Sequence, residues 1–397
     1  MTKRDSGLKV YMATPLGLHG RGGIDSLTDL IIDNFEAHPE LDIRILRLTT
    51  RGGARISLAP FTFAKALGRF WIAARQGKVD LLHVHLGSEG SALRKIILAS
   101  VARRYAVPYI VHPHADSIFF GRFWSTVGRG LSQALRQLES VSTRTGSRYR
   151  TRIIIWSMAF GLGQEIDRLF LGSAAIVAIG EDSKRLICDR IPFVENKIIV
   201  LPNAARPVIG SREPSVRGRV RISFLGEVGS RKGVPQLIDA LGKFAHRDDW
   251  MATIAGNGNL DESRAHTRLL GIDDRVDFPG WLNSGAANDL LRRTDIFVLP
   301  SFAENMPMAI LEAFAHGLAV IATPVGAIPN VIVHEKNGML VPAGDVTALA
   351  AALERMLDSP ELRLKLGEAA RRDYVEHYEI HGYINRLAAI WRRAARS

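Results

Sequence analysis

Two glutamates, Glu304 and Glu312, follow a short apolar run and lie eight residues apart. The run, residues 295–300, is typical of a buried parallel strand. Pro307 suits the first turn of a following helix, where its missing N–H costs nothing. A helix start offers free N–H groups and a positive dipole end, which favour a phosphate or diphosphate. Because carboxylates accept hydrogen bonds from sugar hydroxyls, the stretch predicts a nucleotide-sugar site.

A second stretch with the chemistry to bind phosphate lies at residues 226–233, after an expected strand at 219–225. It contains several glycines together with Arg231 and Lys232, and a helix is expected to follow it. One guanidinium can bind two phosphate oxygens. The same stretch contains Glu227, and a carboxylate beside a diphosphate would oppose its binding. We therefore expect the Glu227 side chain to point elsewhere.

These two stretches and the sequence around them resemble the donor site of the retaining nucleotide-sugar glycosyltransferases of family four (glycosyl transferases group one). The resemblance is strongest over residues 222–345, and three further segments support it. These segments are residues 278–281, 316–326 and 337–342. The resemblance implies the GT-B fold, which is α/β with two facing Rossmann-like, doubly wound domains and a cleft between them.

The resemblance also assigns roles to individual residues. Lys232 matches the lysine that clamps the donor diphosphate, whereas Glu227 replaces the arginine expected five residues earlier. Arg231 is the natural substitute for that arginine. The other donor residues that the resemblance implies are Glu312 at the ribose, Glu304 positioning the sugar, and Asn305 and Met306 at the helix start beside the diphosphate.

The first half of the chain opens with an expected strand at 8–13, a glycine-containing segment at 17–24 and a helix at 25–37. A dinucleotide-binding loop is the competing interpretation. Its spacing differs, and the second strand ends in Thr49-Thr50-Arg51, without the acidic residue that would bind an NAD ribose. An arginine there could suit NADP, so this alternative stays open. The resemblance places Gly22 and Gly23 in the cleft, near the donor phosphates or the acceptor.

Four histidines lie on the expected strands 79–85 and 108–116. His83 and His85 share one strand face, as do His112 and His114, because strand side chains alternate. Four histidines in this arrangement could bind a metal ion, but we expect no metal site here. The resemblance places His114 beside the donor sugar and His85 near the cleft, and we add Asp116 as a cleft or acceptor residue. We expect His83 and His112 to be satisfied core histidines.

Residues 117–172 form an unusually long connection that is rich in arginine, phenylalanine and tryptophan. Basic and aromatic side chains together are typical of a membrane interface. The alternative is a helix pair that covers the sheet with a solvated basic face. Nucleic-acid binding is not favoured, because no nucleic-acid motif accompanies the segment.

Composition limits the class of protein. The chain has 397 residues, of which 47% are hydrophobic and 23% are charged, as in an ordinary two-domain globular protein. The single cysteine, Cys188, excludes an internal disulfide and fits a reducing compartment. The N-terminus lacks the apolar region of a secretory signal, and no apolar run is long enough to span a bilayer.

The net positive charge of the chain comes entirely from its first half. Residues 1–210 contain 29 Lys+Arg and 17 Asp+Glu, whereas residues 211–397 contain 23 of each. This asymmetry predicts an anionic partner for the first half. We therefore expect a cytoplasmic protein that is peripheral on the inner face of the cytoplasmic membrane.

The expected organisation is a first domain at 1–203, a linker at 204–218, a donor-binding domain at 219–379, and a last helix at about 380–397 that returns to the first domain. The predicted function is sugar transfer from a nucleoside-diphosphate-sugar to a glycan acceptor, a membrane lipid-linked oligosaccharide of bacterial surface or exopolysaccharide synthesis. A soluble acceptor and a non-catalytic nucleotide-sugar-binding protein are the alternatives. No cofactor or divalent metal is expected. The sequence shows no clear second carboxylate for a covalent intermediate, which favours same-face attack with the leaving phosphate as base.

Overall fold

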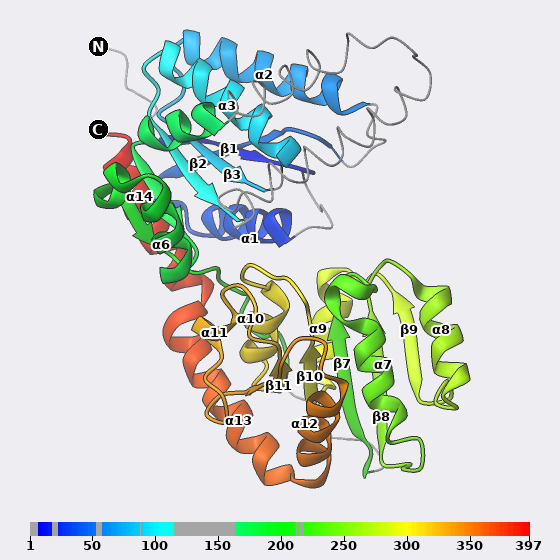
Figure 1. Cartoon of the computed structure of the whole chain (residues 1–397). Helices are drawn as coiled ribbons and strands as arrows, with labels where there is room; N and C mark the ends of the chain where they lie inside the picture. The colour runs from blue at the N-terminus through cyan, green and yellow to red at the C-terminus, as the bar shows by residue number, and fades with distance from the viewer. Residues whose placement is uncertain are drawn as a thin grey trace, which may run out of the picture. The chain divides into compact units, whose positions relative to one another are not determined.

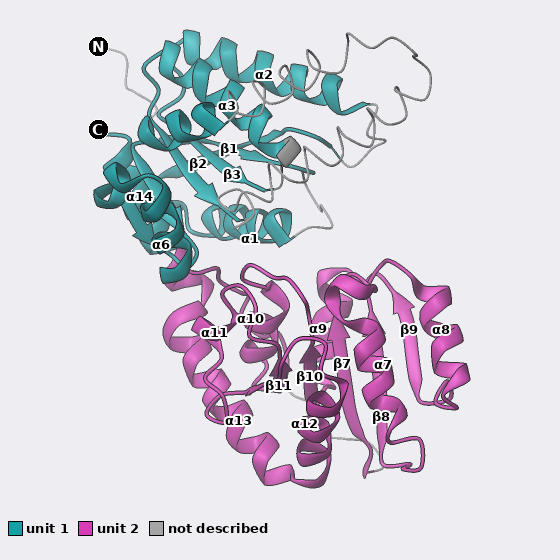
Figure 2. Cartoon of the chain, viewed as in Figure 1, with its two compact units in different colours: residues 1–201, 384–397 teal, residues 202–383 magenta. Residues whose placement is uncertain are grey.

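The computed structural model describes residues 7–17, 23–52, 58–87, 89–114, 163–211, 213 and 218–397. The chain divides into two compact units, each built on one six-stranded sheet (Figure 1). The first unit comprises residues 1–201 and 384–397, and the second comprises residues 202–383 (Figure 2). Two parallel α/β sheets confirm the predicted fold class.

The sheet of the first unit has the order β2-β1-β3-β4-β5-β6, and its neighbouring strands are parallel. The central strands β3, β4 and β5 are buried along their whole length, as expected for apolar strands covered on both faces. The strands are β1 (Leu8–Thr14), β2 (Ile43–Thr49), β3 (Leu81–Leu86), β4 (Tyr109–Pro113), β5 (Ala175–Ala178) and β6 (Ile198–Val200).

Helices cover both faces of this sheet. Figure 1 shows α2 and α3 on one face and α1 on the other. The helices are α1 (Gly23–Ala37), α2 (Ala59–Arg75), α3 (Glu89–Arg104), α6 (Glu181–Arg190) and α14 (Ile380–Ala394), with short 3-10 turns at Pro39–Leu41 and Pro192–Lys197.

The last helix, α14, belongs to the first unit from Ile384 onward. Its Trp391 is fully buried and stacks on Phe35 of α1 with ring centroids 5.0 Å apart. The Trp391 indole N–H donates to Nδ1 of His83 on β3 at 3.1 Å. Helix α14 therefore packs on the same side of the sheet as α1 and helps to fix the histidine side chains there.

The sheet of the second unit has the order β12-β11-β10-β7-β8-β9 and is also parallel. Its strands are β7 (Val220–Leu225), β8 (Trp250–Ala255), β9 (Val276–Gly280), β10 (Ile296–Leu299), β11 (Ala319–Ala322) and β12 (Met339–Leu340). Its helices are α7 (Val234–Gly242), α8 (Leu260–Leu269), α9 (Ser284–Arg292), α10 (Met308–Ala315), α11 (Ile328–Val331), α12 (Val346–Asp358) and α13 (Pro360–Asp373), with a 3-10 turn at Ser230–Lys232 and a π-helical turn at Tyr374–Tyr378.

The strand orders locate one topological switch point in each unit. In the first unit the chain leaves β1 for β2 on one side and then continues with β3 on the other. In the second unit it leaves β7 for β8 and later returns to place β10 on the other side of β7. Ligands of doubly wound sheets bind at the carboxyl ends of the strands that flank such a point. The loops after β1 and β3, and those after β7 and β10, are therefore the places to search for sites.

No helix in the described part of the chain combines the length and apolar character that crossing a bilayer requires. The basic and aromatic segment predicted for a membrane surface lies mainly at residues 117–162, outside the described residues. Its last part, from residue 163 to residue 171, is helical.

Candidate active site

The loop between β10 and α10 is held by backbone contacts with the loop that follows β11. The Thr323 hydroxyl donates to the Ser301 carbonyl at 2.5 Å, and the Ala327 N–H donates to the Asn305 carbonyl at 2.7 Å. Gly326 has a φ of +58°, and a Cβ there would lie 2.0 Å from the Glu304 carbonyl oxygen. Only glycine fits this close approach. The backbone that carries Glu304 is therefore fixed before any ligand arrives.

The loop between β7 and α7 approaches the β10 loop equally closely. Gly233 has a φ of +72°, and a Cβ there would lie 2.0 Å from the Pro300 carbonyl oxygen. The Phe302 N–H donates to the Arg231 carbonyl at 2.9 Å. These contacts bring Lys232 to the end of β10, across the switch point of the sheet.

Lys232 and Glu304 form an ion pair across this switch point, between Nζ and Oε1. The Ser301 hydroxyl donates to the same carboxylate oxygen at 2.7 Å. The side chains of Lys232 and Glu304 are only 14% and 7% exposed. The pair is therefore well shielded from water, which strengthens its electrostatic interaction.

Arg231 and Glu227 form a second pair, at 2.8 Å between Nη2 and Oε2. Both side chains are more than half exposed. The Arg231 Nη1 also donates to the Ala303 carbonyl, at 3.3 Å. The acidic residue that departs from the family pattern thus neutralises the arginine proposed to replace the missing one. The phosphate-binding roles of Lys232 and Arg231 remain predictions.

Glu312 lies in the second turn of α10, whereas Pro307 precedes the helix instead of entering its first turn as predicted. Burial raises the pKa of the Glu312 carboxyl, and the nearby positive charge of Arg206 opposes this effect. The Glu312 backbone carbonyl accepts from Nδ1 of His316 at 2.8 Å. Its assigned contact with a ribose remains a prediction.

Met306 fixes the backbone just before α10, because it is 5% exposed and makes two contacts with Asn203. The Asn203 side-chain amide donates to the Met306 carbonyl, and the Asn203 N–H approaches the Met306 sulfur, each at 3.1 Å. Asn305 is half-buried beside it. Both residues lie at the N-terminal end of α10, the position proposed for a diphosphate.

The four histidines of β3 and β4 lie together on these neighbouring strands, as the alternation predicted. His85 Nδ1 and His114 Nε2 are 2.7 Å apart, and the rings of His112 and His114 have centroids 4.1 Å apart. Burial lowers the pKa of His83 and of His114 to about 3, so these imidazoles are neutral near pH 7. The structure brings the two predicted site histidines, His85 and His114, into direct contact.

The prediction that His83 and His112 are satisfied core residues was wrong in one respect. Both are fully buried, but among the described residues Nε2 of His83 and both ring nitrogens of His112 have no hydrogen-bond partner. The physical reason is the packing, because the rings lie face to face, with centroids 5.4 Å apart. This arrangement brings the faces together and not the nitrogen-bearing edges.

The nitrogens of His83, His85 and His112 lie within 4.8 Å of one another, a spacing that invites a metal. The hydrogen bond from Trp391 argues against three ligands. It uses the Nδ1 lone pair of His83, so in the neutral ring the proton lies on Nε2. His83 then offers no lone pair to a metal, and two histidines remain.

The remaining predicted residues are partly outside the described chain. Gly23 is the first residue of α1. Gly22 and Asp116 lie outside the described residues. The sequence reasoning missed Ser301, which binds the Glu304 carboxylate, and Arg206, which lies near Glu312. A serine at the end of an apolar run was the only signal for the former.

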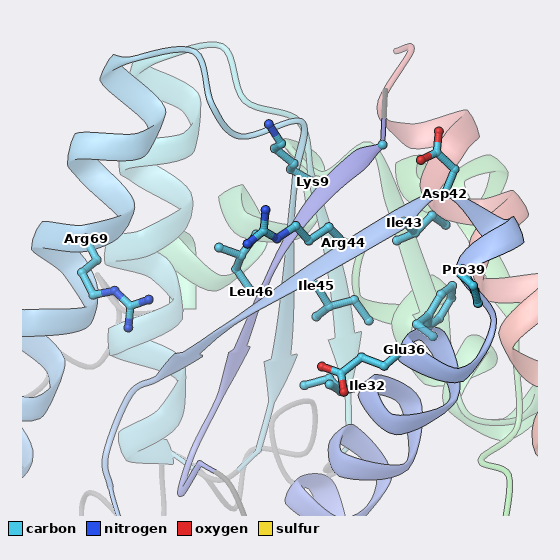
Figure 3. A pocket seen from close by; sticks show the side chains of 12 residues that line it. Lys9, Ile32, Glu36, Pro39, Asp42, Ile43, Arg44, Ile45, Leu46 and Arg69 are labelled. Carbon is cyan, nitrogen blue, oxygen red and sulfur yellow. The ribbon is translucent and has the colours of Figure 1, made fainter. Parts of the chain in front are cut away.

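A surface hollow of the first unit (Figure 3) has none of these residues in its lining. It follows the edge strand β2 from Asp42 to Leu46 and is bordered by α1. Lys9, Arg44 and Arg69 line one part of it, as Figure 3 shows. It lies toward the amino ends of the strands, so it is not at the switch point.

Comparison with known proteins relates the chain to sugar-transferring enzymes. The family model for glycosyl transferases group 1 matches residues 211–373. A protein named an uncharacterized glycosyltransferase, from Methanocaldococcus jannaschii, is 27% identical over 220 residues, which cover 52% of this chain and 56% of that protein. The glycogen synthase of Mycobacterium tuberculosis (H37Rv) is 26% identical over 328 residues, which cover 81% of this chain and 70% of that enzyme.

A solved structure, that of Anabaena HepE in complex with UDP-glucose, has the same fold. It matches with a TM-score of 0.67 at 17% identity and covers 96% of this chain and 98% of that chain. At this identity the match shows the fold alone, which is GT-B.

Proposed function

We propose that the chain is a glycosyltransferase of the group 1 family and that it transfers a sugar from a nucleoside-diphosphate-sugar to a glycan acceptor with retention of configuration. One observation carries this proposal. Lys232 and Glu304 meet at the switch point of the second unit, beside the N-terminal end of α10. A cation and a helix dipole at one place favour a diphosphate, and a carboxylate there can accept from sugar hydroxyls.

Each donor residue has a separate task in this proposal. Lys232, assisted by Arg231, stabilises the negative charge that develops on the leaving diphosphate. The N–H groups of Asn305 and Met306 at the start of α10 act on the same group. Glu312 accepts from the ribose hydroxyls. Because cations and helix N–H groups already stabilise the diphosphate, the reaction needs no divalent metal, and it is expected to persist in EDTA.

The transferred sugar is held by Glu304, and His114 is assigned the hydroxyls near its anomeric carbon. As a neutral imidazole, His114 can donate one hydrogen bond and accept another. With no carboxylate assigned as a covalent nucleophile, the acceptor oxygen attacks from the face that the diphosphate leaves. The departing phosphate oxygen takes the acceptor's proton. Retention of configuration in the product tests this step.

The proposed acceptor is a lipid-diphosphate glycan at the inner face of the cytoplasmic membrane. The whole positive excess of the chain lies in residues 1–210, which suits an anionic acceptor and an anionic surface. The acceptor is assigned to the first unit, with Gly22, Gly23, His85 and Asp116 as candidate contacts.

The test is turnover with a nucleotide-sugar panel, in which UDP-glucose is the first donor because it occupies the structure of HepE. Release of free nucleoside diphosphate, with transfer of the labelled sugar to a membrane lipid extract, supports the proposal. Transfer only to a water-soluble glycan would replace the lipid acceptor. Binding of a nucleotide-sugar without release would identify a non-catalytic binding protein.

A further inference from the structure

A lysine also lies at the switch point of the first unit, and it is fully buried. Lys95 on α3 is 0% exposed, although lysine is almost never fully buried without a partner. Its Nζ donates to the Thr50 hydroxyl at 2.7 Å. In the described part of the chain no carboxylate forms an ion pair or hydrogen bond with it. Lys232, the lysine at the other switch point, has Glu304.

Two hydroxyls without partners in the described part of the chain lie on α3, which carries Lys95, and at the end of β1. Ser91 is one helical turn earlier on α3, on the same face, and its hydroxyl is buried without a partner. The Thr14 hydroxyl, at the end of β1, is also buried without a partner. Thr14 is linked to Lys95 through Thr50, whose hydroxyl donates to the Thr14 carbonyl at 2.8 Å.

Two arginines extend this cluster toward solvent. Arg94 is half-buried, its Nε has no partner, and its charge lowers the pKa of Lys95. Arg51, after β2, is exposed, and its charge lowers the pKa of Arg94. Three like charges that run from the surface to the interior repel one another and cost stability.

Asp25, whose negative charge acts on Lys95, does not remove this repulsion. Asp25 interacts with Lys95 only through space, and its carboxylate oxygen Oδ1 accepts from the N–H groups of Leu16 and Gly17 at 3.0 and 3.1 Å. Burial, together with the charge of Arg94, lowers the pKa of Lys95 to about 7. An anion beside the Nζ atom would restore the charged form.

We propose that Lys95 and Arg94, with the hydroxyls of Thr14 and Ser91, form a subsite for a phosphoryl group of the acceptor. Cations that form no ion pair in the described part of the chain, together with buried hydroxyl donors, match phosphate oxygens, and a guanidinium can bind two of these oxygens at once. The carboxyl ends of β1 and β3 at a switch point are where a doubly wound sheet binds ligands. That the ligand is the acceptor rests on the function proposed above.

Calorimetric titration of the full chain tests this subsite, with pyrophosphate and a short-chain prenyl diphosphate as probes. The parent chain and all variants in this titration also contain Lys232→Met, which removes the lysine of the other candidate phosphate site. Saturable binding is expected, and Lys95→Met should weaken it about tenfold or more, the effect of losing one charged hydrogen bond. Arg94→Met, which alters a half-buried residue, should also weaken it. Lys65→Met, which alters an exposed lysine of α2, should leave the dissociation constant unchanged.

The melting temperature separates this role from a structural one. Without ligand, Lys95→Met should melt higher than the parent chain, because a buried unpaired cation is removed. If pyrophosphate binds as well as the prenyl diphosphate, the site recognises free phosphate, and if only the latter binds, it recognises a lipid. Either result supports the subsite, provided that Lys95→Met weakens the binding.

Two results would overturn the inference. One is that neither probe binds, and the other is that Lys95→Met and Arg94→Met both bind as Lys65→Met does. Donor turnover by the unmodified chain is measured separately. Turnover without Lys95-dependent binding contradicts the subsite alone, and Lys95-dependent binding without turnover contradicts the proposed transferase reaction.

Discussion

Lys232 and Glu304 are 72 residues apart in the chain, yet their side chains form an ion pair between the loops that follow β7 and β10. In the absence of ligand the carboxylate neutralises the lysine. A donor diphosphate must therefore share Lys232 with Glu304, or replace it. The pair connects the group proposed to bind the phosphates with the group proposed to bind the sugar, and three predictions concern it and its neighbours.

Replacing Lys232 by alanine should lower kcat/KM for the nucleotide-sugar by about 100-fold or more, because a cation beside the leaving group is lost. Steady-state kinetics measure this effect. Lys336→Ala, which alters an exposed lysine of the same unit, is the matched control and should have wild-type kinetics. Equal activity of both variants would remove Lys232 from the site.

The same substitution should also destabilise the chain. Lys232→Ala leaves the Glu304 carboxylate, which is 7% exposed, with Ser301 as its hydrogen-bond donor. The expected loss in free energy of unfolding is about 1–3 kcal/mol, measured by urea denaturation. Adding Glu304→Ala should restore part of this loss, because the unpaired charge is removed. Strictly additive losses would show that the two side chains do not interact.

Glu227→Gln should tighten donor binding several-fold, because it frees the Arg231 guanidinium from its present partner. The effect is measured as a lower dissociation constant for the nucleotide. In an Arg231→Ala background the same change should have a smaller effect. A dissociation constant that rises in Glu227→Gln would instead give the carboxylate a positive role in the site.

Acid should destabilise the first unit through its histidines. Burial lowers the pKa of His83 and of His114 to about 3, below the value of about 6.5 in an unfolded chain. Below pH 6.5 the unfolded state therefore binds more protons, so the free energy of unfolding falls as the pH falls toward 3. The slope is at most about 1.4 kcal/mol per pH unit for each histidine.

Urea denaturation at several pH values measures this slope. His83→Phe should reduce it, whereas His381→Asn, at a half-exposed side chain, should leave it unchanged. An identical slope in His83→Phe and the parent chain would contradict the assigned cause.

The sequence predicted the sheet architecture closely, because buried parallel strands are continuous apolar runs. The expected strand at 8–13 is β1 (Leu8–Thr14), and the expected strand at 295–300 is β10 (Ile296–Leu299). The shared faces of the histidines also followed from strand alternation. These features depend on neighbours along the chain.

Features that depend on residues far apart in the sequence were not predicted. The sequence of residues 226–233 does not show that Lys232 reaches Glu304, which lies 72 residues further along the chain. Lys95 drew no attention, because lysine normally indicates an exposed position. Its burial follows from the packing of α3 on β3, which brings Lys95 to Thr50 after β2, and only the assembled unit reveals this arrangement.

Donor binding by the second unit is the central claim, and thermal unfolding with UDP-, GDP-, ADP- and TDP-sugars tests it most directly. A ligand that binds only the folded state raises the melting temperature. We predict that one nucleotide stabilises the wild-type chain and Lys336→Ala, but not Lys232→Ala combined with Glu312→Ala. The absence of any shift in the wild type, or an equal shift in the double variant, would contradict the assignment of the donor site.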